Sequence, residues 1–290
     1  MKIENEEITF IVQGPVGTET KKCVNSIREN YPGSEIILST WIGTDIDLIK
    51  RMTMKNIVYS TDPGASGRMF LNNKIFNNIN RQLVSTKVGL SKVNTKYAVK
   101  TRTDFRFINS NLKDFLNKYE DFCINEEMRF VDKRILTLGA DRRFPFFIFD
   151  FCFAGKSSDL RLLFNIPLMD RADAQYFPEH EPDNMSIYNI FQSHFRWIPE
   201  QFIILSSLKE NGISAASEYF HGDWSKLNEE IMLKSLRNLI SNFCVLGFDN
   251  FGVRPTKDSL QWLINKRNEN HINFQEWLFH YKNLTGVRNK

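Results

Sequence analysis

The feature that most constrains the fold is an alternation of strand and helix patterns through residues 8–101. Apolar runs of strand length are separated by more polar segments of helix length. Strands joined by helices of this length usually lie parallel, with right-handed crossovers. The sequence therefore predicts an α/β fold with a mostly parallel sheet flanked by helices. The expected strands are Ile8–Val16, Glu35–Trp41, Asn56–Ser60 and Tyr97–Thr101.

Two of the connecting segments have the spacing of amphipathic helices. Cys23, Ile27 and Tyr31 recur every four residues, so they share one helical face. A later segment places Arg81 and Ser85 on a different face from its apolar stripe. Both segments are therefore expected to pack on the sheet. The apolar stripe of the second consists of Ile79, Leu83, Thr86 and Leu90.

The rest of the chain is less regular. The simplest organisation is one α/β domain in residues 1–215, with residues 216–290 as a helical extension packed on it. The elements expected before that boundary are a strand at Phe146–Phe153 and helices at Ser157–Phe164, Met185–Phe195 and Pro199–Asn211.

Charge and cysteine content argue against several classes of protein. The 38 basic and 34 acidic residues are interspersed, which is not the pattern of a dedicated nucleic-acid binder. The four cysteines lie far apart without a CxxC pair, as expected of free thiols in a reducing compartment. The N-terminus lacks the layout of a signal peptide, and the aromatic run Phe144–Phe153 is too short to span a bilayer. A cytoplasmic protein is therefore expected.

Polar motifs follow the ends of four expected strands. Ligands of open α/β sheets bind at the carboxyl ends of the strands, so several polar strand ends together indicate a binding site. Each motif also has a structural explanation, because Gly-Pro and Pro-Gly pairs form turns and an Asp can cap a helix. The motifs are Gln13-Gly14-Pro15, Trp41 with Asp45 and Asp47, Asp62-Pro63-Gly64 and Arg102-Thr103-Asp104-Phe105-Arg106.

The last of these motifs places one carboxylate between two arginines. In a continuous strand, Arg102, Asp104 and Arg106 would share one face. Asp104 could bind Mg²⁺ or Mn²⁺, which would bridge the phosphates of a nucleotide donor. Arg102 and Arg106 could instead bind the phosphates directly. The alternative is a structural ion pair, and the residues alone leave these interpretations open.

Common catalytic signatures are missing from the sequence. It contains no GxGxxG after a strand, no GxxxxGK[ST], no HExxH and no GxSxG. Their absence argues against a dinucleotide oxidoreductase, a P-loop kinase, a zinc protease and an α/β-hydrolase. The five histidines also lack the spacing of a metal site.

Five motifs in order give the sequence a resemblance to a known family. They are QGP, STW, DPG, NNINRQLVST with the following GL, and YAVKTRTDFRF, all within residues 8–107. In this order they resemble the WavE-type lipopolysaccharide-synthesis family, whose members are regarded as glycosyltransferases of bacterial surface-polysaccharide assembly. WIPEQF at Trp197–Phe202 is a weaker match, and the C-terminal third carries almost none of the pattern.

The resemblance implies a GT-A-like, Rossmann-related fold with a nucleotide-sugar site at the ends of the first strands. Asp104 would then stand where a DxD carboxylate sits in such enzymes. The sequence has TRTD and lacks the first Asp, so dependence on Mn²⁺ or Mg²⁺ is left open. The residues expected to face the nucleotide, ribose or phosphates are Gln13, Gly14, Asp62, Asn73, Asn80, Arg81, Arg102 and Arg106.

An inverting transferase needs a carboxylate that takes the proton of the acceptor hydroxyl. Glu200 follows Pro199 in the expected first turn of a helix, where unpaired N–H groups stabilise an acid. That position is also a sufficient structural reason for Glu200. His221 is a candidate ligand for a metal or a diphosphate, although such a histidine is more often an ordinary loop residue. The candidate bases are Glu200 and Asp183, with Glu179 and Glu181 nearby in the sequence.

The expected function is sugar transfer from a nucleotide sugar to a glycan or lipid-linked acceptor in lipopolysaccharide, O-antigen or capsule synthesis. Two alternatives stay open: a non-catalytic scaffold with a degenerate nucleotide-sugar fold, and a sugar nucleotidyltransferase. No nucleic-acid partner is expected. Peripheral contact with the cytoplasmic face of the inner membrane is expected. The aromatic and basic residues of Gln261–Lys290 suit either an interfacial helix or a helix that packs its aromatic side chains on the core.

Overall fold

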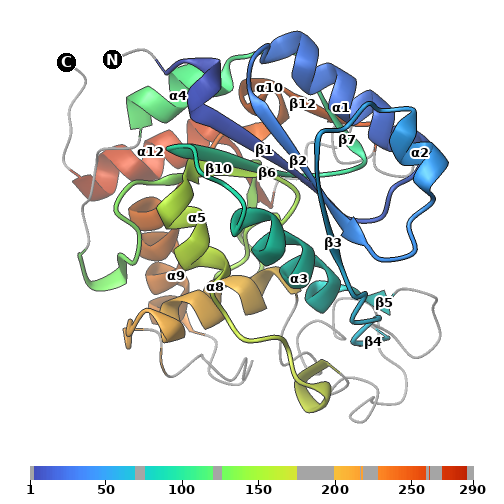
Figure 1. Cartoon of the computed structure of the whole chain (residues 1–290). Coiled ribbons are helices and arrows are strands. Elements are labelled where there is room, and N and C mark those ends of the chain that lie inside the picture. Colours follow the sequence, from blue (N-terminus) through green and yellow to red (C-terminus); the bar gives the residue numbers. More distant parts are fainter. Residues whose placement is uncertain are drawn as a thin grey trace.

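A central sheet organises the chain, as the computed structural model shows (Figure 1). The structure describes residues 3–68, 76–119, 126–174, 199–215, 217, 228–258, 261 and 270–285. The sheet has seven strands in the order β11-β8-β10-β6-β1-β2-β3. Its strands are β1 (Ile8–Gln13), β2 (Glu35–Trp41), β3 (Asn56–Ser60), β6 (Tyr97–Arg102), β8 (Ile135–Thr137), β10 (Phe153–Lys156) and β11 (Phe243–Val245).

The sheet is mostly parallel, as the sequence predicts. β1 pairs in parallel with both β2 and β6, β2 pairs in parallel with β3, and β8 pairs in parallel with β11. Only β10 runs antiparallel to its neighbours β6 and β8 within this sheet. The carboxyl ends of β1, β2, β3 and β6 therefore lie at one edge of the sheet.

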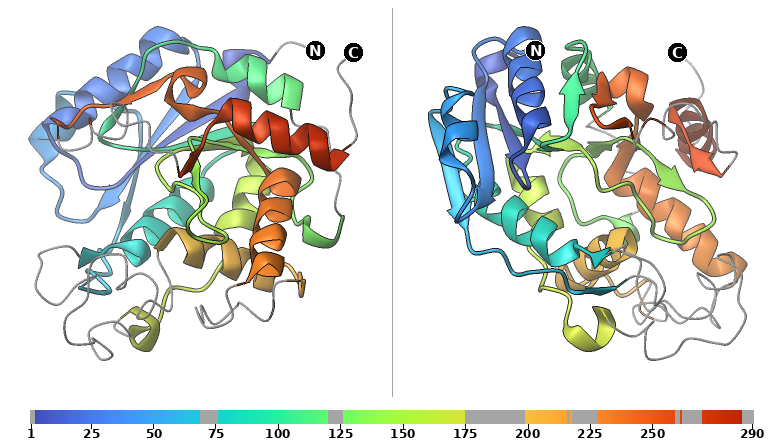
Figure 2. Two further views of the ribbon diagram at one scale, coloured as in Figure 1. Left: turned by 180° about the vertical axis from the view of Figure 1, so that it is seen from behind. Right: turned by 90° about the vertical axis from the view of Figure 1, so that its right-hand side faces the viewer.

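Helices cover both faces of the sheet (Figures 1 and 2). Alternate side chains of β1 show this: the Phe10 ring lies 4.8 Å from the ring of Tyr31, directly after α1, whereas Ile11 lies beneath Gly89 of α3. The helices are α1 (Thr18–Asn30), α2 (Ile46–Lys50), α3 (Ile79–Leu90), α4 (Leu112–Tyr119), α5 (Ser157–Phe164), α8 (Pro199–Glu210), α9 (Glu229–Asn242), α10 (Gly247–Phe251) and α12 (Phe274–Thr285), with short 3-10 helices at Asn5–Glu7 and Glu126–Met128.

Within the described ranges, three short strand pairs lie outside the central sheet. β7 follows β6 after a turn at Thr103 and Asp104, so the alternation expected for Arg102, Asp104 and Arg106 in one strand is wrong. The pairs are β7 (Phe105–Phe107) with β12 (Val253–Pro255), β9 (Ala140–Asp141) with β13 (His271–Ile272), and β4 (Gly67–Arg68) with β5 (Phe76–Asn77).

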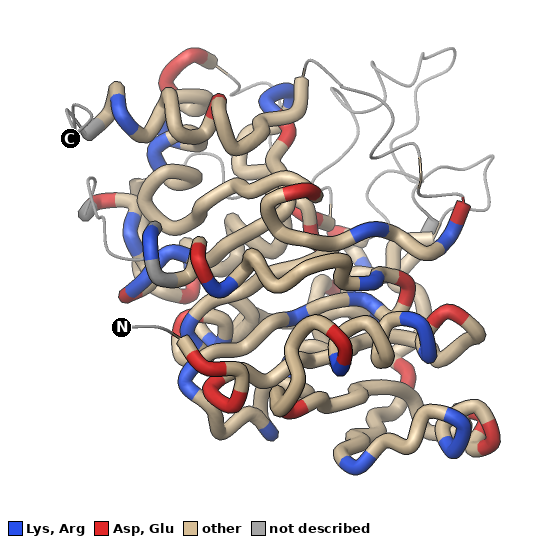
Figure 3. Tube along the Cα trace, turned by 90° about the horizontal axis from the view of Figure 1, so that it is seen from above, with Lys and Arg blue, Asp and Glu red and all other residues tan. Residues whose placement is uncertain are grey.

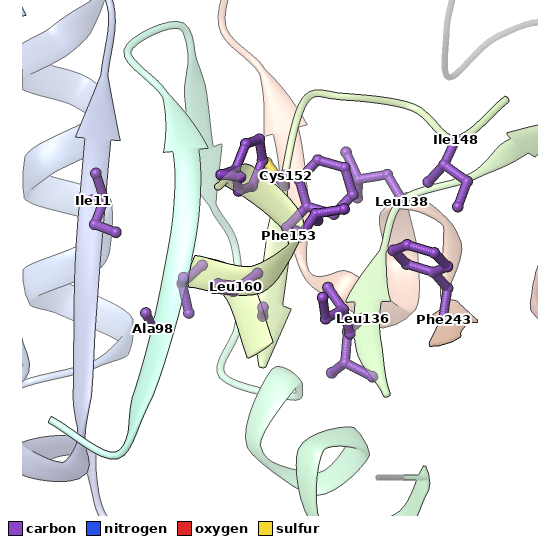
Figure 4. Packing of buried hydrophobic residues seen from close by; sticks show 14 of the residues in the cluster. Ile11, Ala98, Leu136, Leu138, Ile148, Cys152, Phe153, Leu160 and Phe243 are labelled. Carbon is purple, nitrogen blue, oxygen red and sulfur yellow. The ribbon is translucent and has the colours of Figure 1, made fainter. Parts of the chain in front are cut away.

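The apolar core extends across the whole sheet into the C-terminal elements (Figure 4). Ile11, Ala98, Phe153, Leu136 and Phe243, from five neighbouring strands, are all buried. Because β11 is an edge strand of the sheet, residues on both sides of the expected boundary at 215 build one sheet. The division into a domain of residues 1–215 and an extension of 216–290 stays a prediction.

α12 packs its aromatic side chains inward. The side chain of Trp277 is completely buried, and its Nε1 donates a hydrogen bond to the Phe243 carbonyl oxygen at 3.0 Å. Tyr281 stacks on Trp277 with 5.1 Å between ring centroids. These contacts match the alternative in which the C-terminal aromatic residues join the core.

One expected strand is wrong. Phe146–Phe153 is not a strand, because β10 begins only at Phe153 and Phe146 has a left-handed backbone with φ of +58°. The three cysteines in the described part of the chain, Cys23, Cys152 and Cys244, are buried free thiols, as expected.

Charged side chains are interspersed along the chain. Figure 3 shows Lys and Arg alternating with Asp and Glu over the described trace, in line with the balanced composition. Across that part of the chain, no helix combines the length and the apolar character needed to cross a bilayer.

Candidate functional site

A pocket of about 580 Å³ opens where the carboxyl ends of β1, β2, β3 and β6 meet. The start of α3 and the first turn of α8 complete its walls. The position is the one expected for a ligand site in an open α/β sheet. Its lining residues are Gln13, Gly14, Pro15, Trp41, Asp62, Phe76, Asn78, Ile79, Arg81, Gln82, Arg102, Thr103, Asp104, Asp150, Phe151, Pro199, Glu200 and Lys257.

The turn after β1 is fixed to both neighbouring strands. The Gly14 N–H donates to the Ser39 carbonyl oxygen at 3.0 Å, and the Thr103 N–H donates to the Gln13 carbonyl oxygen at 3.2 Å. Gly14 has φ of +118°, a conformation that favours glycine at this turn. Ser85 of α3 donates to Gln13 Oε1 at 2.6 Å, which leaves the Nε2 donors of Gln13 for a ligand.

Arg81 and Asp62 form a two-bond ion pair on the pocket wall. Arg81 Nε and Nη2 each lie 2.8 Å from an oxygen of Asp62, and Nη1 donates to Asn78 Oδ1 at 3.0 Å. The hydrogen bond from Arg81 lowers the pKa of Asp62, so this carboxyl group is ionised at neutral pH. Both side chains are more than a third exposed and can therefore meet a ligand.

Asp104 is buried between two cations at the inner end of the pocket. Arg102 binds it through Nε at 2.9 Å and Nη2 at 2.7 Å, and Lys257 Nζ lies 2.9 Å from Oδ2. Burial alone would raise the pKa of Asp104, but the bonds from Arg102 and Lys257 outweigh burial and lower it. The backbone supports this contact, because the Thr256 N–H donates to the Asp104 carbonyl oxygen at 2.9 Å.

These contacts bear on the expected metal site. Both oxygens of Asp104 accept bonds from cationic groups, so a metal ion would have to displace Arg102 or Lys257. Among the described residues, no group of three or more His, Cys, Asp or Glu side chains lies close enough together to hold a metal ion by itself. The described side chains therefore do not fit a bound Mn²⁺ or Mg²⁺ at Asp104. The ionic arrangement instead leaves three cations, Arg81, Arg102 and Lys257, on one pocket.

Glu200 faces the pocket from the first turn of α8. Burial, together with the negative charge of Asp150, raises the pKa of Glu200 to about 8, whereas the positive charge of Arg102 opposes the shift. A carboxyl group with a pKa near 8 holds its proton in most molecules at neutral pH and can exchange it there. Of the two preferred candidate bases, Glu200 is therefore placed at the pocket with a pKa suited to proton transfer.

The completely buried Lys100 is a residue that the motifs do not reveal. Its Nζ donates to the Asp150 carbonyl oxygen and lies 5.7 Å from the centroid of the Phe153 ring. Burial lowers the pKa of Lys100 to about 8, although the charge of Asp150 opposes that shift. A lysine in the middle of the apolar run YAVKT is the signal that could have indicated it.

Two predicted ligand-binding residues lie outside the pocket. Asn80 uses both ends of its amide to hold the Met169 backbone, with bonds of 2.9 Å and 2.8 Å. Arg106 lies on β7 with its side chain exposed. Asn73, Asp183 and His221, together with Glu179 and Glu181, lie outside the described residues, so their roles stay predictions.

Comparisons with known proteins identify a family and distantly similar solved structures. The family model for WavE lipopolysaccharide synthesis matches residues 8–289. No curated protein matches the sequence. Among solved structures, the chain is similar to 4-diphosphocytidyl-2C-methyl-D-erythritol synthase from Anaerococcus prevotii, with 12% sequence identity and a TM-score of 0.35. That match covers 62% of this chain and 87% of the other.

Proposed function

Because the chain belongs to the WavE lipopolysaccharide synthesis family, we propose that it is a glycosyltransferase that moves a sugar from a nucleotide-sugar donor to a glycan or lipid-linked acceptor. The observation that supports this most is the pocket at the strand ends, where three cations face one carboxyl group of raised pKa. The cations can bind a diphosphate, and the carboxyl group can take the proton of an acceptor hydroxyl.

Arg81, Arg102 and Lys257 form the cationic wall of the pocket, which is proposed to bind the nucleotide-sugar donor. Arg81 is exposed enough to exchange Asp62 for a phosphate oxygen, and Lys257, whose side chain is 52% exposed, can turn from Asp104 toward the same diphosphate. Trp41 offers an aromatic face for the nucleobase, and Gln13 offers its Nε2 donors. Once Arg81 has exchanged Asp62 and Lys257 has turned from Asp104, the two cations stabilise the leaving nucleoside diphosphate.

Glu200 supplies the proposed base. Its deprotonated carboxylate takes the proton of the acceptor hydroxyl while that oxygen forms a bond to the anomeric carbon of the sugar. The bond from that carbon to the diphosphate oxygen breaks, and the electron pair leaves with the nucleoside diphosphate. Because the pKa of Glu200 is about 8, the transfer rate is expected to rise with pH, to reach half its maximum near pH 8 and to level off only at higher pH.

Binding and product analysis test the proposal. Nucleoside diphosphates and nucleotide sugars should raise the melting temperature, because a ligand that binds only the folded state stabilises it by mass action. When the protein is supplied with a membrane extract that contains lipid-linked glycans, it should then release nucleoside diphosphate from the matching nucleotide sugar. Release of inorganic diphosphate from a nucleoside triphosphate plus a sugar phosphate would instead identify a nucleotidyltransferase. An absence of both binding and turnover would leave the scaffold alternative.

Two variants locate the chemistry. Arg81→Ala should weaken nucleotide binding by about 1.5–3 kcal/mol, the range for a hydrogen bond to a charged group. Arg106→Ala is the matched control, because Arg106 is exposed and lies outside the pocket. Glu200→Gln should keep donor binding and lose about 10²–10⁴-fold in transfer rate, the range for general-base catalysis. Equal binding by Arg81→Ala and Arg106→Ala would contradict the phosphate role.

A further inference from the structure

The antiparallel pairing of β7 with β12 determines where Lys257 lies (Figure 1). Pro255 pairs with Phe105 in the register of these strands, and the Thr256 N–H donates to the Asp104 carbonyl oxygen at 2.9 Å. The next residue is Lys257, whose Nζ lies 2.9 Å from Asp104 Oδ2. Backbone pairing therefore brings a cation from the C-terminal part of the chain to the turn that follows β6.

Arg102 is the counter-ion of two carboxylates of the same pocket. Its Nε and Nη2 donate to Asp104 at 2.9 Å and 2.7 Å. Burial alone would lower the pKa of Arg102, but the hydrogen bonds and the charge of Asp104, together with the charge of Asp150, raise it. The guanidinium also lies 5.3 Å from the centroid of the Phe151 ring. These contacts hold Arg102 in place beside both carboxylates.

A divalent ion at this end of the pocket would need oxygens that are already in use. Both oxygens of Asp104 accept bonds from cations, and an added Mg²⁺ or Mn²⁺ would be repelled by those cations at close range. Two further carboxyl groups of the pocket are also poor ligands. Asp62 is paired with Arg81, and burial raises the pKa of Glu200 to about 8, so Glu200 is mostly protonated at neutral pH, whereas a metal ligand must be deprotonated.

We propose that Arg102 and Lys257 take the place of a divalent metal ion, so that the protein binds the diphosphate of its donor without Mn²⁺ or Mg²⁺. Such an ion links a carboxylate of the protein to the phosphates and neutralises the leaving group. The guanidinium of Arg102 has five N–H donors, of which Asp104 accepts two. Lys257 is half-exposed and can turn toward a phosphate oxygen. This inference rests on the proposed function and adds that the donor binds in its metal-free form.

Calorimetric titration of the full chain tests the inference directly. The probes are the diphosphates of uridine, guanosine, cytidine, adenosine and thymidine, each in a buffer with EDTA and in one with excess Mn²⁺ or Mg²⁺. The diphosphate that binds should bind as tightly in EDTA as with either metal. An affinity that falls about tenfold or more in EDTA would overturn the inference, because a metal ion would then supply a binding contact.

Variants of Lys257 test which group replaces the metal ion. Lys257→Met removes the ammonium group and should weaken diphosphate binding in EDTA by about tenfold or more, as expected for a hydrogen bond from a charged group. Lys257→Arg keeps the charge and should bind more tightly than Lys257→Met. Lys156→Met is the matched control, because Lys156 is also paired with an aspartate but lies opposite Tyr97, at the other end of β6. It should bind like wild type.

The outcomes separate this inference from the proposed function. Binding that requires Mn²⁺ or Mg²⁺ would overturn the metal-free inference and leave a nucleotide site in place. Equal affinities of folded Lys257→Met and Lys156→Met would also overturn it, again with the nucleotide site intact. If none of the diphosphates bound in either buffer, the inference and the proposed function would both be wrong.

Discussion

At the scale of single residues, Asp104 joins two distant parts of the chain. Arg102 reaches it from the end of β6, and Lys257 reaches it from the residues after β12. The Arg102 guanidinium also lies over the rings of Phe105 and Phe151, at 5.9 Å and 5.3 Å. The carboxylate therefore fixes the orientation of two of the three cations on the pocket.

Asp104→Asn is expected to destabilise the fold. Removing the negative charge leaves Arg102 and Lys257 facing each other, and loss of one member of a buried ion pair costs about 3–5 kcal/mol. Both partners are partly exposed, so we expect about 2–3 kcal/mol in urea unfolding at pH 7. Asp47→Asn, whose side chain is 71% exposed in its pair with Lys50, is the control and should change stability by less than about 0.5 kcal/mol.

The difference in stability between wild type and Asp104→Asn depends on pH, because the pKa of Asp104 is lowered in the folded protein. A carboxyl group with a lowered pKa stabilises the folded state above its pKa in the unfolded chain, about 4, and loses that contribution as the pH falls through its folded value. The difference between wild type and Asp104→Asn should therefore be largest at neutral pH and shrink below about pH 4. Equal stability at pH 7 would mean that the ion pairs contribute nothing.

At the scale of elements, the contact of α3 with β1 and β2 determines where the functional side chains of α3 lie. Gly89 lets the helix approach the sheet, because an added Cβ would lie 2.4 Å from Ile11 Cγ2 and 3.3 Å from Ser39 Cβ. Seven residues earlier, Gln82 faces the pocket and donates to the Asp150 carbonyl oxygen at 3.2 Å. Close packing at one end of α3 thus positions the polar side chains at the other.

Gly89→Ala should destabilise the protein by about 1–3 kcal/mol, although alanine is the better helix former. The reason is the clash with Ile11, which forces the helix or the strand to move. Gly155→Ala is the matched control, because its added Cβ would lie 3.5 Å from the nearest atoms of Ile135, an ordinary contact. Chemical unfolding of both variants measures the difference. A Gly89→Ala protein at least as stable as wild type would show that the interface has spare room.

The elements with their own periodic pattern could be predicted from the sequence. The apolar stripe expected over residues 79–90 is buried in α3, and the four N-terminal strands were placed with small errors at their ends. The run Phe146–Phe153 could not be read correctly, because it is apolar throughout and its turn depends on a left-handed Phe146 held by Ser235. Local pattern carries no information about such a tertiary contact.

The sequence predicts the candidate site at the N-terminal strand ends and at Glu200, which also lines the pocket. Gln13, Asp62, Arg81 and Arg102 follow strands or lie on a helix with clear patterns, and all four line the pocket. Lys257 was missed, because its place beside Asp104 depends on the pairing of β12 with β7, which no local motif shows.

At the scale of the whole molecule, the C-terminal residues complete the sheet. We therefore expect a chain that ends after residue 227 to lose cooperative unfolding or to aggregate, because the edge of β8 would be unpaired and Trp277 would leave the core. Size-exclusion chromatography and thermal unfolding measure this. A chain that ends after residue 285 keeps every described element and is the control. Cooperative folding of residues 1–227 would support the division into a domain and a C-terminal extension packed on it, which the sequence predicts.

β11 lies at the edge of the sheet and is synthesised well after β8, so β8 lacks this pairing partner for a time during synthesis. β8 pairs with β11 in the register Ile135 to Phe243, across roughly a hundred residues of intervening chain. At about 5–20 residues per second, the ribosome delivers β11 on the order of 5–20 s after β8. Throughout that interval one edge of β8 has exposed N–H and carbonyl groups that can pair with another nascent chain. Slower translation of residues 138–242 lengthens that exposure, so the yield of folded protein should depend on elongation rate in this stretch more than in the first hundred residues.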